Sequence, residues 1–116
     1  MPKKKRIPTN LQECFDVLKT YKGIEEFKNM KEEDVMGNYH FNLGVYIRNE
    51  WELWNEKYTL HKYFGEMGLW HPDDMSGVIL TSFHRYLNGK DLEVDKQIVE
   101  YLKYWQSVNK NVANSH

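Results

Sequence analysis

The sequence predicts an all-α fold, arranged as a single compact, irregular bundle of five to six helices. Only three Pro and seven Gly interrupt its 116 residues, which is too few for the many turns of a β fold. Apolar residues recur every three or four positions along most of the chain, as on the buried face of an amphipathic helix. Hydrophobic residues make up 41% and charged residues 28%, a balance typical of a globular protein rather than a disordered one.

The pattern divides the chain into three regions. Residues 1–8 form a basic flexible tail, residues 9–108 form the helical domain, and residues 109–116 are expected to fray. The tail carries four consecutive basic residues, Lys3 to Arg6.

The first helix of the domain has a clear start. Thr9 or Asn10 caps it, because a Gln or Glu lies three residues after each of them and either register gives a capping box. Gly23 ends this unit. The next stretch, 24–36, carries two short apolar groups among many charges, which predicts two short helices or one irregular helix closed at Gly37.

Residues 39–54 are predicted to form the central helix, around which the others pack. Apolar residues lie on most of its circumference, and such a helix is buried on most of its surface. Gly44 lies within the main apolar stripe, where a close helix crossing would explain its presence despite its low helix propensity. The main stripe consists of His40, Leu43, Gly44, Ile47, Trp51 and Trp54.

Three more helices complete the bundle. A short helix covers residues 58–64. Pro72 suits the first position of the following helix, and Asp73 and Asp74 complement the positive end of its dipole. The last helix covers about 93–108, with apolar residues at helical spacing.

Charge and cysteine content narrow the setting. The net charge is -1 and the first six residues contribute +4, so the remaining body carries -5. An acidic body argues against a broad nucleic-acid interface and leaves only weak phosphate contacts by the basic tail. Cys14 is the single cysteine, so no intrachain disulfide can form, and no apolar run approaches the ~20 residues of a membrane span. We therefore expect a cytoplasmic protein without membrane contact, in which Cys14 is a small core residue.

Arg48 is the polar residue that most needs a partner, because it flanks the apolar stripe of a helix expected to be buried. The leading interpretation is a structural ion pair with Asp73 or Asp74. The alternative is that Arg48 faces a nucleotide or another small anion, helped by His40 or His71 and a stacking Trp. The residues proposed for such a ligand site are His40, Arg48, Asn49, Trp51, Trp70, His71, Asp73 and Asp74.

A metal site receives little support from the spacing. The side chains of His71, Asp73, Asp74 and His84 have suitable ligand atoms, but the sequence has no HExxH and no paired CxxC. Asp73 already has a sufficient role at a helix start. We predict neither a metal ion nor a cofactor, and no catalytic residue.

Two segments resemble a family of small bacterial and phage proteins that is known only as a domain of unknown function. The first follows an HFxLGxxIRNxxxLW pattern from His40 to Trp54, and the second follows an HPDDxSxxIL pattern from His71 to Leu80. Asn42 and Glu52 stand where the family pattern leads us to expect glycine. The resemblance covers about residues 9–105 and implies a bacterial or phage origin but no activity. It draws attention to the polar residues of both motifs, Ser76 included.

Three hypotheses for function follow. The first is a non-catalytic binding or regulatory module that binds a protein partner, since the chain is rich in aromatic residues and has no recognisable nucleophile and base. The second is a protein that binds a small anion through Arg48 and the histidines. The third is a metal-dependent hydrolase that uses His71, Asp73 and His84.

Overall fold

The computed structural model describes residues 7–114, with side chains up to residue 109, and the described chain is all α with no strand. The basic residues Lys3 to Arg6 lie outside the described residues. Seven α-helices and one short 3-10 helix follow in order: α1 (Leu11–Leu18), α2 (Ile24–Asn29), η1 (Glu32–Asp34), α3 (Val35–Tyr39), α4 (Leu43–Glu50), α5 (Thr59–Gly65), α6 (Pro72–Leu87) and α7 (Val94–Asn114).

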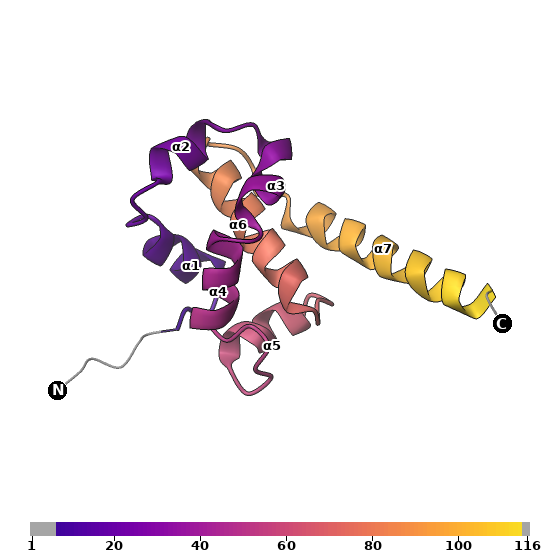
Figure 1. Cartoon of the computed structure of the whole chain (residues 1–116). Helices are drawn as coiled ribbons and strands as arrows, with labels where there is room; N and C mark the ends of the chain where they lie inside the picture. Colours follow the sequence, from indigo (N-terminus) through magenta and orange to yellow (C-terminus); the bar gives the residue numbers. More distant parts are fainter. Residues whose placement is uncertain (1–6, 115–116) are drawn as a thin grey trace.

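The centre of the molecule is α6, not the predicted helix at 39–54. In Figure 1, α6 lies in the middle, and it contacts α1, α2, α3, α4 and α7. Phe83 of α6 stacks on Phe27 with ring centroids 5.6 Å apart and lies 5.7 Å from Phe15. Burial extends to most of the α6 circumference, including polar side chains, because helices pack on several of its sides. Its buried residues are Met75, Ser76, Gly77, Val78, Ile79, Leu80, Ser82, Phe83 and His84.

The predicted helix at 39–54 is therefore wrong in length as well as in position. Its helical part is α4, and both ends have local causes. Asn42 caps α4 by accepting a hydrogen bond from the Leu43 N–H at 2.6 Å. At the other end Glu52 adopts φ +45°, Leu53 N–H donates to the carbonyl of Arg48, and Glu52 N–H donates to that of Asn49. This pair of bonds is a Schellman motif, which places its left-handed residue just after the helix.

Sequence signals correctly predicted the starts of α1 and α6. Asn10 is the N-cap of α1 and accepts from the Glu13 N–H at 2.9 Å, while Thr9 donates to the Glu13 carboxylate. Pro72 occupies the first turn of α6 as predicted. Gly37 was expected to close a helix, but it lies within α3.

The last helix, α7, is longer than the predicted 93–108 and reaches Asn114. It extends away from the other helices toward the C-terminus (Figure 1). No helix in the described part of the chain is long and apolar enough to cross a membrane.

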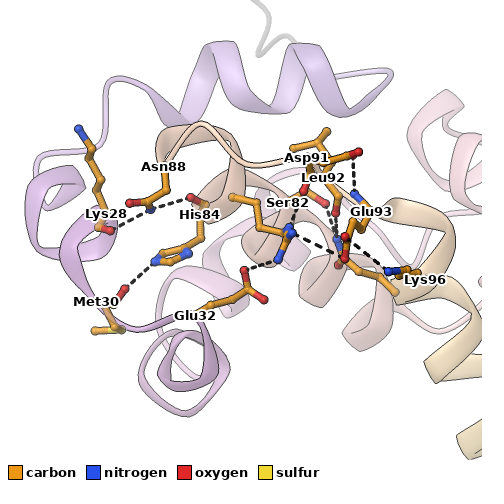
Figure 2. Close-up of polar contacts among 12 residues, drawn as sticks. Lys28, Met30, Glu32, Ser82, His84, Asn88, Asp91, Leu92, Glu93 and Lys96 are labelled. Carbon is orange, nitrogen blue, oxygen red and sulfur yellow. Dashed lines mark hydrogen bonds and ion pairs between the residues drawn. The ribbon is translucent and has the colours of Figure 1, made fainter.

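Polar contacts fasten the beginning of α7 to α6 (Figure 2). Arg85 pairs with Glu32 at 2.7 Å and with Glu93 at 3.6 Å. Gln97 donates to the hydroxyl of Ser82 at 3.0 Å. Ser82 lies about one helical turn before Arg85 on α6. These contacts fix where α7 leaves α6, and so determine which surface of α6 it covers.

Candidate functional site

Arg48 lies at the junction of α4, α6 and the α3–α4 turn, and the fold satisfies most of its guanidinium. One terminal nitrogen donates to the Ser76 hydroxyl at 2.8 Å, and the other donates to the His40 carbonyl at 2.9 Å. The Nε atom lies 3.3 Å from a carboxylate oxygen of Asp73. The side chain of Arg48 is only 13% exposed. The ion pair expected with Asp73 or Asp74 thus forms with Asp73.

Gly44 makes room for this arrangement. A Cβ at this position would lie 2.9 Å from a terminal nitrogen of Arg48 and 3.1 Å from the carbonyl oxygen of Tyr39. Both distances are shorter than ordinary van der Waals contact. The guanidinium and the end of α3, rather than a crossing of two long helices, account for the glycine.

His71 caps α6, a role that the sequence analysis did not assign. Its Nδ1 accepts a hydrogen bond from the Asp73 N–H at 3.1 Å, so a neutral His71 carries its proton on Nε2. Its ring stacks on Trp105 of α7, with centroids 5.6 Å apart and planes 24° apart. Trp105 in turn donates from Nε1 to a carboxylate oxygen of Asp74 at 2.7 Å. Two residues at the start of α6 therefore hold the Trp105 ring of α7: His71 contacts its face and Asp74 its nitrogen.

Four rings form what we call the aromatic patch: Trp70, His71, Tyr104 and Trp105. Trp70 lies 4.8 Å from Trp105 at 44°, and Tyr104 lies 5.2 Å from it at 75°. The outer two rings are largely open to solvent, since Trp70 is 57% exposed and Tyr104 is 59% exposed. Large rings are usually buried, and an exposed group of them is typical of a contact surface.

Burial by α6 and α7 also affects an ionisable group beside the patch. Desolvation, with a smaller contribution from the negative charge of Asp74, raises the pKa of Tyr101 above its ordinary value. The Tyr101 hydroxyl lies against Gly77, where a Cβ would be 2.2 Å from its oxygen. Tyr101 is therefore a packing residue in contact with α6.

The structure brings together six of the eight residues proposed for a ligand site. His40 and Asp73 contact the guanidinium of Arg48, and Trp70, His71 and Asp74 adjoin Trp105. The other two lie apart from this group. Trp51 is in the core at 4% exposure, and Asn49 is exposed on α4.

The residues considered for other chemistry are separated or enclosed. His71 and His84 flank opposite ends of α6, about 20 Å apart along its axis at 1.5 Å per residue, so they cannot share one metal ion. His84 is buried and donates from Nε2 to the Met30 carbonyl at 2.7 Å (Figure 2). Burial raises the pKa of the Cys14 thiol, which leaves it a poor nucleophile. Within residues 7–109 no group of three or more His, Cys, Asp or Glu side chains is placed to hold a metal ion.

Tyr104 and the role of Trp105 were not predicted from the sequence. Trp105 lies on the apolar stripe of α7, and a stripe does not reveal where its helix leaves the body. Tyr104 lies off that stripe, and a large ring on a polar helix face was the available signal. The burial of Trp54 was predicted wrongly: it was assigned to a buried stripe but is 58% exposed.

These features define a small all-α domain in which an internally bonded arginine lies next to an exposed aromatic surface. The chain belongs to the family described as Domain of unknown function (DUF6794), whose model matches residues 7–87. The expected membership in a domain family of this kind is thereby confirmed. No curated protein and no solved structure matches the chain. The matched segment ends with α6, so α7 and its two rings of the aromatic patch follow it.

Proposed function

We propose that this protein is a non-catalytic module that binds a protein partner through the aromatic patch, and that it acts as a regulatory protein in the cytoplasm of a bacterium or of a phage-infected cell. The observation that carries the proposal is the exposure of Trp70 and Tyr104 beside Trp105, whose ring is held by Asp74 and His71. Trp and Tyr dominate binding energy at protein interfaces, and a ring held in place before binding loses little freedom on association.

The enclosure and internal bonding of Arg48 favour this proposal over binding of a small anion. An anionic ligand would have to compete with Asp73, Ser76 and the His40 carbonyl for a side chain that is mostly enclosed. The rings, by contrast, are already accessible. Anion binding through Arg48 and the histidines stays an alternative that this geometry favours less.

Affinity capture with a matched control tests the proposal. The immobilised full chain and its variants Trp70→Ala, Tyr104→Ala and Trp54→Ala are exposed to bacterial lysate, and any protein retained specifically is purified and titrated against each variant by calorimetry. Trp54 is the control because its exposure, 58%, nearly equals the 57% of Trp70.

We expect Trp70→Ala to weaken binding of the purified partner at least about tenfold, as for a typical interface hot spot, while Trp54→Ala leaves the affinity unchanged. Equal affinity for the wild type and for Trp70→Ala and Tyr104→Ala would refute the proposed surface. Circular dichroism of each variant verifies that it is folded before the titration is interpreted.

A further inference from the structure

We infer that the aromatic patch recognises a basic segment of the partner protein, with an arginine side chain stacked on its rings. This inference rests on the proposed function and specifies the chemistry of the partner. It follows from how the rings are inclined, from which charges lie beside them, and from the pairing of Arg48 with Asp73.

The rings offer faces to a planar cation. Trp105 is pinned by Asp74 and stacked on His71, while Trp70 and Tyr104 stand at 44° and 75° to it rather than parallel. Rings inclined in this way cannot cover one another fully, and the two outer ones are more than half exposed. A cation placed over the face of Trp or Tyr within about 6 Å is attracted by the quadrupole of the ring.

The charges beside the patch favour a cation over an anion. Asp73 and Asp74 both adjoin the rings, and the side chain of Asp73 is 50% exposed. The enclosed Arg48 pairs with Asp73 and offsets much of its charge, so the net negative charge at the patch comes mainly from Asp74. The residues beyond the first six carry a net charge of -5, and a net negative charge attracts basic partners.

Arginine suits this surface better than lysine. Its planar guanidinium stacks on aromatic faces, and its fork of donors matches a carboxylate such as that of Asp73. The fold already contains a simpler contact of the same kind, in which the Lys19 ammonium lies 5.3 Å from the centroid of the Tyr86 ring. A partner side chain would repeat this contact on rings that are more exposed and flanked by acids.

A peptide titration tests the inference with the full chain. A short oligo-arginine peptide is the probe, with oligolysine and oligoglutamate of equal length as comparators, at an ionic strength near 0.15 M to screen non-specific attraction. Affinities are measured by calorimetry, and the tryptophan side-chain signals are followed by NMR.

We expect oligo-arginine to bind more tightly than oligolysine, with no binding of oligoglutamate, and to shift the Trp70 and Trp105 signals. Trp70→Ala should weaken binding of oligo-arginine about three- to thirtyfold, and Tyr104→Ala should act in the same direction. Trp54→Ala should bind as the wild type does. Unchanged binding in both patch variants, or equal binding of oligoglutamate, would overturn the inference.

The two proposals can fail separately. If a captured partner depends on Trp70 but oligo-arginine binds regardless of this residue, the patch binds protein and the inferred basic chemistry is wrong. If neither ligand depends on Trp70 or Tyr104, both proposals are wrong. A partner segment that loses affinity on Arg→Gln substitution, without effect from Lys→Gln, would support the inference directly.

Discussion

The hydroxyl oxygen of Tyr101 lies where a side chain on Gly77 would have to be, only 2.2 Å from the position of its Cβ. This contact joins the last two helices in the first half of α6. It also joins the family-matched segment to the helix that follows it. The fit predicts that even one methyl group at residue 77 forces the Tyr101 side chain to move.

Gly77→Ala should therefore lower the free energy of unfolding by about 1–3 kcal/mol, the usual cost of overpacking a close contact. Gly37→Ala is the matched control, because a Cβ added at this residue of α3 would meet nothing within 4 Å, and it should raise stability by about 0.4–1 kcal/mol. Chemical denaturation measures both. Adding Tyr101→Phe to Gly77→Ala removes the clashing oxygen and should recover part of the loss; no recovery would place the strain elsewhere.

Glu52 occupies the left-handed position that ends α4, with φ +45°, and there glycine has no steric penalty. Glu52→Gly should be more stable than Glu52→Ala by about 1 kcal/mol. The two variants are compared with each other because both lose the hydrogen bond to Tyr58 that raises the pKa of that phenol. Thermal and urea unfolding provide the measurement, and an equal stability of the two would argue against backbone strain at this residue.

Arg48 should contribute to stability through its buried hydrogen bonds more than through its ion pair, because Asp73 is half exposed. Arg48→Met should lower the free energy of unfolding by about 2 kcal/mol, since it leaves the Ser76 hydroxyl and the His40 carbonyl without this donor. Arg48→Lys should recover little of it, because lysine lacks the fork of donors.

Lys103→Met provides the comparison for Arg48, since Lys103 is 67% exposed and pairs with Glu100 one turn away on α7. It should change stability by less than about 0.5 kcal/mol. If Arg48→Met proved equally harmless, the guanidinium would be dispensable to the fold and the anion-binding alternative would gain.

Tyr101 should make the protein less stable in alkaline solution. Its pKa is raised by burial and by Asp74, so between the ordinary value of about 10 and the higher folded value the unfolded chain has released a proton that the folded chain keeps. The free energy of unfolding then falls as the pH rises through this window. Tyr39 and Tyr58, whose pKa values are also raised, contribute in the same direction.

The contribution of Tyr101 is isolated by comparing the wild type with Tyr101→Phe across this range, using denaturation curves and the ultraviolet absorbance of the phenolate. The decline should be shallower in the variant. Asp74→Asn should move the pKa of Tyr101 part of the way back. Parallel stability curves for the wild type and Tyr101→Phe would contradict a raised pKa at this residue.

Sequence patterns predicted the helical fold because apolar spacing and end signals are local. Asn10 caps α1 and Pro72 begins α6 through contacts within a few residues of each. The error at 39–54 also has a local cause, since a periodic apolar stripe does not record that Asn42 caps a new helix or that Glu52 turns left-handed. A glycine at residue 52, as the resemblance led us to expect, would have marked that end.

The candidate site was only partly predictable, because its contacts join distant segments. The need of Arg48 for an acid was evident from its place beside an apolar stripe, and Asp73 supplies it. That Trp105 would meet Asp74 and His71 depends on the path of α7 over α6, which Ser82, Arg85, Glu93 and Gln97 fix through tertiary contacts. No spacing rule within one helix contains that information.

The path of α7 has a practical consequence for anyone who trims this chain. A fragment cut to the limits of the family match would lack Tyr104 and Trp105 and would uncover the flank of α6 that Tyr101 protects. Such a fragment is expected to express poorly and to bind other proteins non-specifically through the exposed surface of α6. Screens for a binding protein should therefore begin with all 116 residues.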